Sequence, residues 1–302
     1  MRKRLAVLWC MAVSLWAAAE FTFDQQDTQL LLCKDGKPWL STQIAPFDAN
    51  RAEETYKVYT HIYDFDGSAP ITKGPGGKYT HHRGLFIGWN KTLVGEAEES
   101  FDTWHMKDCF QRHAAWLDLQ GGADRAVQRE KVLWCRASSE PFIEEERAIA
   151  VTEGTGGARI IDFTSQLTSV AGTIKLGGDL QHAGMQVRMD NEVSEHEDST
   201  QYILPEGARE LEDDKVVGAW WVCCSPVVRD KRYWLVHMTA NDLVTGQPVY
   251  SIRRYARFGA FFEPVLDQGK PLTVRFRVAV SDRELDKAAC EALYQEYVKG
   301  GR

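Results

Sequence analysis

Three segments of the sequence combine arginine and glycine with histidine or tyrosine. The first is "KYTHHRGLFIGWN", residues 78–90, the second is "HAGMQVRM", residues 182–189, and the third is "YARFGAFF", residues 255–262. Histidine is the side chain best suited to proton transfer near neutral pH, because its ordinary pKa is about 6.5. Arginine and glutamine supply donors for hydroxyl or carboxylate oxygens. Together the segments are candidates for one site of acid/base chemistry.

Strand alternation predicts which of these side chains share a surface, because successive residues of a β-strand point to opposite faces. In the second segment one face is polar, and the other is apolar. In all three segments one face carries polar or aromatic residues interrupted by glycine: His82, Gly84, Phe86, Gly88 and Asn90; His182, Gly184, Gln186 and Arg188; Tyr255, Arg257, Gly259 and Phe261. Glycine in such a row would let a ligand approach the backbone. The alternative is an ordinary solvated strand face.

The position of His81 depends on where the first strand begins. If the strand is regular from His81 onward, His81 and Arg83 lie on the opposite face from His82. If it begins at Gly84 or contains a bulge, both histidines can point into one site. We therefore rank His82 first and keep His81 as a candidate.

The predicted site combines proton-transferring and ligand-binding side chains. The candidate catalytic residues are His82, His182, His81 and His105. The candidate substrate-binding residues are Arg83, Trp104, Gln186, Arg188, Tyr255 and Arg257. His82 and His182 would act as acid and base, while Trp104 or Phe86 stacks on a ring of the ligand. For any single histidine, a hydrogen bond to a neighbouring loop is the alternative role.

A metal site is a second interpretation of the histidines. His81, His82, His105 and His113 fall within a short span, and two or three of them together with His182 could hold one ion. The sequence contains neither an HExxH motif nor an HxH pair. The sequence requires no cofactor, and a divalent metal ion bound by histidines is kept as an alternative hypothesis.

Most of the chain has the composition of antiparallel strands. Hairpins are predicted around Asp35-Gly36 and around Gly154–Gly157, where turn residues separate two runs rich in aliphatic, aromatic or β-branched residues. A single clear helix is predicted at the C-terminal end, with Ser281 and Glu284 as its capping box. We expect an all-β fold, a large antiparallel β-sandwich with a C-terminal helix.

The N-terminus has the layout of a secretory signal peptide, with basic residues, an apolar run and a cleavage site after Ala19. We expect residues 1–19 to be removed and residues 20–302 to form a single domain in the periplasm or outside the cell. Loss of three basic residues changes the net charge from −7 to −10. This charge argues against nucleic acid and anionic membranes as partners. No later segment is long and apolar enough for stable membrane insertion.

Four pieces of the chain carry a family resemblance: "YTHHRGLFIGWNK", "DTWHMKD", "QHAGMQVR" and "SIRRYARFGAFF", in this order. They resemble the secreted bacterial proteins labelled methane oxygenase PmoA-like. The resemblance implies a galactose mutarotase-like supersandwich, a fold that carries epimerases, polysaccharide lyases and glycosidases. It therefore favours a sugar or oligosaccharide ligand.

Three functional hypotheses follow. The first is an extracytoplasmic carbohydrate-active enzyme of epimerase, mutarotase, lyase or glycosidase type that uses histidine acid/base chemistry. The second is a non-catalytic carbohydrate-binding protein. The third is a metal-dependent oxidase or oxygenase, as the family label suggests.

Overall fold

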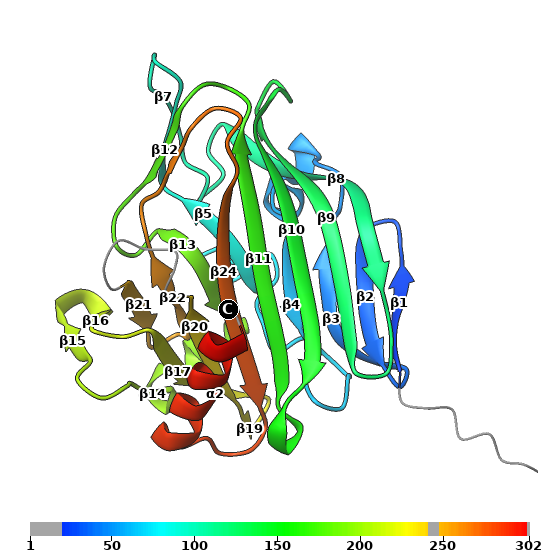
Figure 1. The fold of residues 1–302 in the computed structure, drawn as a ribbon, viewed down its shortest axis with the longest axis vertical. Coiled ribbons are helices and arrows are strands. Elements are labelled where there is room, and N and C mark those ends of the chain that lie inside the picture. Colours follow the sequence, from blue (N-terminus) through cyan, green and yellow to red (C-terminus); the bar gives the residue numbers. More distant parts are fainter. Residues whose placement is uncertain (1–19, 241–247, 301–302) are drawn as a thin grey trace, which may run out of the picture.

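Two large antiparallel β-sheets pack face to face in this protein (Figure 1). The computed structural model describes residues 20–240 and 248–300. The predicted signal peptide, residues 1–19, lies outside the described residues. The predicted all-β antiparallel sandwich with a C-terminal helix is confirmed.

The ten-stranded sheet contains the three segments of chemical interest. Its strands, in spatial order, are β1 (Phe21–Gln25), β2 (Gln29–Lys34), β3 (Lys37–Gln43), β4 (Tyr59–Ile62), β5 (Leu85–Trp89), β13 (Ala183–Arg188), β22 (Arg257–Phe261), β21 (Val249–Arg253), β16 (Lys215–Val217) and β15 (Arg209–Leu211).

The second layer is an eight-stranded sheet. Its strands, in spatial order, are β14 (Gln201–Ile203), β17 (Trp221–Ser225), β20 (Trp234–Thr239), β24 (Leu272–Ser281), β11 (Arg159–Ser169), β10 (Pro141–Glu153), β9 (Arg125–Arg136) and β8 (Cys109–Gln120).

Smaller elements complete the fold. A four-stranded sheet consists of β23 (Val265–Leu266), β12 (Ile174–Gly177), β6 (Lys91–Val94) and β7 (Glu99–Phe101), and a two-stranded one of β18 (Val227–Val228) and β19 (Lys231–Arg232). The helices are α1 (Ala52–Thr55) and α2 (Lys287–Gly300), with short 3₁₀ turns η1 (Ala49–Arg51), η2 (Thr155–Gly157), η3 (Asn191–Glu195), η4 (Glu197–Ser199) and η5 (Glu212–Asp214).

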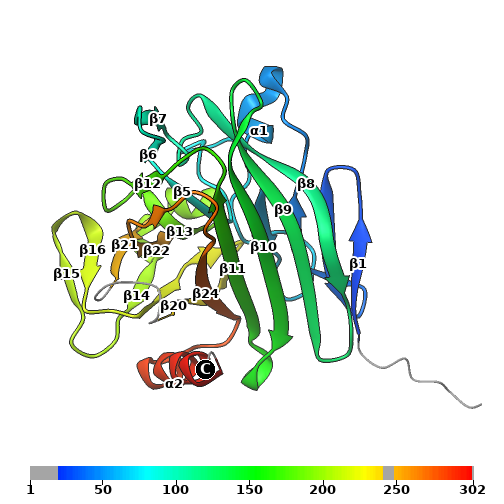
Figure 2. The same ribbon diagram turned by 45° about the horizontal axis from the view of Figure 1, so that its top comes forward.

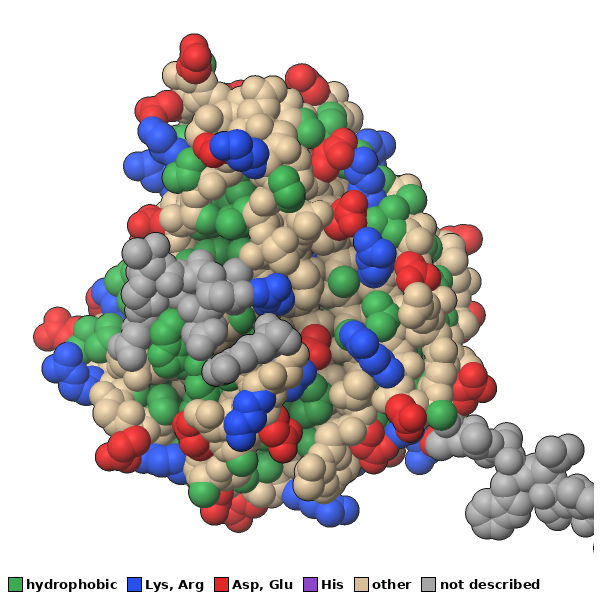
Figure 3. Space-filling model, viewed as in Figure 1, with side chains coloured by type: hydrophobic (Ala, Val, Ile, Leu, Met, Phe, Trp, Pro, Cys, Tyr) green, Lys and Arg blue, Asp and Glu red, His purple; other side chains and the backbone are tan. Residues whose placement is uncertain are grey.

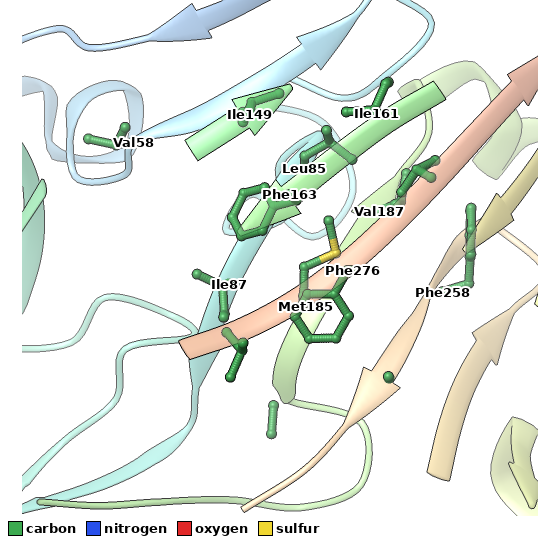
Figure 4. Close-up of a cluster of buried hydrophobic side chains, with 14 of the residues drawn as sticks. Val58, Leu85, Ile87, Ile149, Ile161, Phe163, Met185, Val187, Phe258 and Phe276 are labelled. Atoms are coloured by element: carbon green, nitrogen blue, oxygen red, sulfur yellow. The ribbon is translucent and has the colours of Figure 1, made fainter. Parts of the chain in front are cut away.

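The hydrophobic core lies between the two large sheets. Leu85 and Ile87 of β5 and Val187 of β13 face Phe163 of β11 and Phe276 of β24, and all of these side chains are buried (Figure 4). Burying one side chain of this size stabilises the fold by about 1.5–3 kcal/mol. Because this face of the ten-stranded sheet is apolar, the polar residues at the alternate positions must face away from the core.

Both predicted hairpins are confirmed. Strands β2 and β3 pair through the turn at Asp35 and Gly36, whose φ angles are 53° and 73°. Positive φ at both central residues is the geometry that matches the right-handed twist of a two-residue hairpin. The second predicted turn joins β10 to β11.

The C-terminal helix begins later than its predicted capping box. The Ser281 hydroxyl bonds to the backbone of Arg283 instead, with distances of 3.0 Å to its N–H and 2.8 Å to its carbonyl. The Asp286 carboxylate accepts a hydrogen bond from the Ala289 N–H at 2.8 Å and so caps the helix that starts at Lys287. The predicted capping box was therefore wrong, because Ser281 ends strand β24.

Helix α2 covers part of the eight-stranded sheet (Figure 2). Its Cys290 and Tyr294 pack against Trp221, Val236 and Ala279. On the face of the molecule seen in Figure 3, acidic and basic side chains are interspersed, as on an ordinary solvated surface. Among the described residues, no helix is long and apolar enough to cross a membrane.

Candidate functional site: a histidine cluster on the ten-stranded sheet

The three glycine-containing rows lie side by side, because β5, β13 and β22 are consecutive strands of the sheet. The register places Gln186 of β13 opposite Phe86 of β5 and opposite Gly259 of β22, and it places Arg188 opposite Arg257. Residues directly opposite each other in an antiparallel pair share a face. The strand residues of the three rows therefore share the side of the sheet that faces away from the core.

Both histidines of the first segment join this surface. Strand β5 begins at Leu85, so His81 and His82 precede it in a turn, and the ring centroids of the two histidines lie 4.3 Å apart. Of the two alternatives, the structure shows the late strand start and not a regular strand from His81 onward. The ring centroids of His81 and His105 are 4.2 Å apart, and those of His105 and His182 are 5.3 Å apart. The four candidate histidines thus form one continuous cluster.

Two of the histidines are held by carboxylates that the sequence-based site did not include. The Nδ1 atom of His105 is 2.8 Å from Asp102, and that of His182 is 2.7 Å from Asp179. A carboxylate at Nδ1 keeps the proton on that nitrogen and leaves Nε2 of the neutral ring as an acceptor. The sequence contains a signal for both pairs, since "DTWH" and "DLQH" have the same D-x-x-H spacing.

The two carboxylates are themselves fixed by hydrogen bonds. Burial alone would raise the pKa of Asp102, but hydrogen bonds from the side chain and backbone of His105 outweigh it and lower this pKa. Burial likewise opposes the hydrogen bonds from His182 and Gln181 at Asp179, where the pKa is also lowered. Both carboxyl groups therefore stay ionised as fixed acceptors for the two imidazoles.

Three of the histidine rings, those of His81, His82 and His182, are kept neutral by their surroundings. Burial, followed by the charge of Lys57, lowers the pKa of His81 to about 2. Burial and then the charge of Arg257 lower the pKa of His82 well below its usual range. At His182 burial also lowers the pKa, although the hydrogen bond to Asp179 opposes it. At physiological pH these neutral rings can accept a hydrogen bond.

Exposure differs across the cluster. The side chains of His105 and His182 are 25% and 32% exposed. His82 is buried beside Tyr79, which is 40% exposed and whose ring lies 5.4 Å from the His82 ring. Tyr79 also contacts Tyr255, with ring centroids 4.7 Å apart. The aromatic pair lies beside the buried histidine.

Arg83 and Trp104 occupy different positions from those predicted. Arg83 is fully buried, and its guanidinium donates to the backbone carbonyls of Thr80, His82 and Glu53. Trp104 is also fully buried, with its ring 4.9 Å from Phe86 and 5.7 Å from His182. These side chains are packed among the loops around the histidines, and the binding roles predicted for them stay predictions.

Gln186, Arg188 and Arg257 are buried in the sheet as well. Gln186 accepts a hydrogen bond from Arg257 at 3.1 Å, and Arg188 donates to the Tyr255 carbonyl and to Ser194. The binding roles predicted for these residues and for Tyr255 stay predictions.

The glycines in the rows make room for protein rather than for a ligand, which corrects the sequence-based interpretation. A Cβ atom at Gly88 would lie 2.5 Å from the Thr103 carbonyl oxygen. At Gly184, where φ is +79°, it would lie 2.0 Å from the Ala260 carbonyl oxygen. The segment that carries Trp104 therefore rests directly on β5.

No group of three or more histidine, cysteine, aspartate or glutamate side chains in residues 20–240 and 248–300 is placed to hold a metal ion. His113, which the metal hypothesis included, lies on β8 of the other large sheet and pairs with Glu130 at 2.9 Å. The histidine-bound metal stays a prediction.

Residues 29–295 match a family of unknown function, DUF6807. The chain belongs to the DUF6807 family. The match does not support the methane oxygenase label expected from the sequence. No curated protein shows significant similarity to this DUF6807 sequence.

Two solved structures share a low similarity with the DUF6807 chain. One is a heparan sulfate lyase, HepC, from Pedobacter heparinus, with 9% identity and a TM-score of 0.37, over 89% of this chain and 36% of the lyase. The other is a GalM/aldose epimerase homologue from C. elegans, with 7% identity and a TM-score of 0.39, over 86% of this chain and 99% of the homologue. The chain spans about a third of the length of the lyase. TM-scores in this range carry no argument about activity.

Proposed function

We propose that this protein is an extracytoplasmic enzyme that acts on a carbohydrate by histidine acid/base chemistry. The observation that carries the proposal is the pair His105 and His182. Their rings lie 5.3 Å apart, both are partly exposed, and each has an aspartate at Nδ1. Two oriented imidazoles next to each other suit the removal of a proton from a ligand and the return of a proton to it.

His182 is assigned as the base. Burial lowers its pKa, so the ring is neutral near pH 7, and Asp179 keeps the proton on Nδ1. Its Nε2 atom is then free to take a proton from a hydroxyl or from a carbon next to a carbonyl. His105, oriented in the same way by Asp102, is assigned as the partner that returns a proton: it gives the proton from Nε2 of its protonated form, so that His182 ends the step protonated and His105 neutral. A positioned acid or base of this kind contributes about 100- to 10,000-fold to a reaction rate.

The carbohydrate assignment is supported by the side chains next to the histidines. Tyr79 and Tyr255 offer aromatic rings beside polar groups, a combination that suits a ligand with apolar C–H faces and many hydroxyls. The carboxylates of Asp102 and Asp179 are engaged by histidines, which favours histidine chemistry over glycoside hydrolysis by two free carboxyl groups. The location outside the cytoplasm rests on the signal-like residues 1–19.

The test is turnover of a panel of sugars and oligosaccharides by His182→Gln and His105→Gln. We expect each substitution to lower turnover by about 100-fold or more. His113→Gln is the matched control, because His113 also pairs with a carboxylate but lies on the other large sheet. Wild-type turnover by both folded variants would reject the assignment. Sugar binding by calorimetry without any product would instead favour the non-catalytic carbohydrate-binding protein.

A further inference from the structure

Five cationic side chains are buried around the histidine cluster without a carboxylate partner. They are at most 4% exposed: Lys57, Lys73, Arg83, Arg188 and Arg257. Among the described residues, none of the five forms an ion pair, whereas the equally buried Arg147 has Glu145 at 2.9 Å. A buried charge without a partner is costly, and burial lowers the pKa of Lys57 well below its usual range, so the excess of positive charge at this site rests mainly on the arginines.

Three of these cationic side chains donate hydrogen bonds to backbone carbonyls. Lys57 donates to the carbonyls of His81 and Trp104, and Lys73 donates to those of Gly74 and Gly76. The guanidinium of Arg83 also binds only backbone carbonyls. These contacts hold the loops in place and use most donors of the three side chains, although the buried Nε of Arg83 has no partner among the described residues.

Arg257 differs from these three side chains. Within the described part of the chain its guanidinium makes one hydrogen bond, to the neutral amide of Gln186 at 3.1 Å, and its buried Nε has no partner. Guanidinium carries five N–H donors and binds a carboxylate through two parallel hydrogen bonds. Arg257 therefore has N–H donors left that could bind a planar anion.

Further unpaired groups lie around Arg257. Its Cζ is 5.7 Å from the ring of Trp104, whose buried indole Nε1 has no hydrogen-bond partner among the described residues. The Trp104 ring is 6.0 Å from that of His82, and both ring nitrogens of His82 are buried and equally unpaired. Unpaired buried polar groups are uncommon in native proteins and call for a partner. The partner that fits a guanidinium, an indole N–H and an imidazole is an anion with several acceptor oxygens.

We propose that Arg257, together with His82 and Trp104, binds the carboxylate of an acidic sugar, so that the substrate is a uronic acid or an oligosaccharide containing one. This inference rests on the proposed carbohydrate function and narrows its substrate class. The guanidinium fork can bind a carboxylate through two parallel hydrogen bonds, and the sulfated sugar in the test below separates a carboxylate from a tetrahedral anion. His82 lies next to Tyr79, which is partly exposed and places this group of donors close to the surface.

The test is calorimetric titration of the mature protein with pairs of matched sugars. D-Galacturonate is compared with D-galactose, and D-glucuronate with D-glucose, both as single sugars and as short oligosaccharides. A sulfated glucose tests whether a different anion binds. We expect the uronates to bind about tenfold or more tightly than the neutral sugars, because a charge-assisted hydrogen bond is lost with the carboxylate. Arg257→Gln and His82→Gln remove the preference, and Arg257→Lys keeps part of it. Arg277→Gln, on the outer face of β24, is the control that leaves the preference unchanged.

The outcomes separate this inference from the proposed function. Equal binding of uronates and neutral sugars, or a preference that survives Arg257→Gln, overturns the inference while the acid/base function stands. Binding of the sulfated sugar without the uronates overturns the carboxylate assignment. Failure of every sugar to bind overturns the inference. Uronate binding that depends on Arg257, without any turnover, supports the inference and counts against the proposed enzyme.

Discussion

The amide of Gln186 on β13 accepts a hydrogen bond from the guanidinium of Arg257 on β22, at a distance of 3.1 Å. Glutamate has the same shape as glutamine, so the sheet could hold a carboxylate here with little change in packing, at the loss of the hydrogen bond that the Gln186 NH₂ group donates to the Ala183 carbonyl at 3.3 Å. With glutamine in this position, Arg257 is anchored without being neutralised.

The substitution Gln186→Glu would place a negatively charged carboxylate next to Arg257. We expect the free energy of unfolding to rise by about 1–2 kcal/mol, since hydrogen bonds to charged groups are stronger than those between neutral groups. Binding of an acidic sugar would fall at the same time, because the new carboxylate occupies the donors of Arg257. Urea unfolding and calorimetry of the same samples measure both effects. A variant less stable than the wild type would argue against an excess of buried positive charge at this site.

Asp179→Asn tests the orientation of His182. An amide can turn its NH₂ group toward Nδ1 and so favour the other tautomer, in which Nε2 carries the proton and cannot act as a base. We expect turnover to fall by about 100-fold or more with little change in KM. Glu98→Gln is the control, because Glu98 pairs with Lys175 on the surface away from the cluster. Turnover equal to that of the wild type would remove Asp179 from the mechanism.

Acid should destabilise the fold through His237. Burial lowers the pKa of this fully buried histidine from 6.5 to about 3. Between these two values the unfolded chain binds a proton that the folded chain does not, so the stability present above pH 6.5 is lost as the pH falls. We expect a loss of about 1 kcal/mol per pH unit from this group. Urea unfolding from pH 7 to pH 4 should give a shallower slope for His237→Gln, and parallel curves for the two proteins would contradict the prediction.

A metal requirement can be separated from acid/base chemistry by chelation. The proposed mechanism predicts that turnover survives dialysis against a strong chelator and that elemental analysis of the purified protein finds no stoichiometric copper, iron or zinc. Loss of turnover on chelation, restored by one divalent metal, would make the histidines ligands instead. Ultraviolet–visible spectra after addition of Co²⁺ provide a readout that does not depend on activity.

Gly88→Ala tests the contact between β5 and the segment that carries Trp104. The added methyl group would lie 2.5 Å from the Thr103 carbonyl oxygen, so the segment must move. We expect the free energy of unfolding to fall by about 1–3 kcal/mol, as for other overpacked sites. Gly300→Ala, which meets open space at the end of α2, is the control. Unchanged stability of Gly88→Ala would show that the segment adapts freely.

Strand periodicity was sufficient to predict the polar rows, because the alternation of side chains in a β-strand is a fixed geometric property. It could not show that β5, β13 and β22 are neighbours, since strand pairing depends on the packing of the whole sandwich. The position of Trp104 followed from a backbone contact at Gly88 that no local pattern encodes. Asp102 and Asp179, by contrast, share a visible D-x-x-H spacing with their histidines and could have been found from the sequence.

The order of strands in the ten-stranded sheet has a consequence for how the site forms. β5, β13 and β22 come from distant parts of the chain, so their pairing requires the closure of long loops, which slows folding. Local hairpins such as β2–β3 can form early, but the donors of Arg257 meet His82 only when the central strands have paired. In a refolding experiment, the return of ligand binding would therefore mark the last step toward the native state and would lag behind the recovery of strand content.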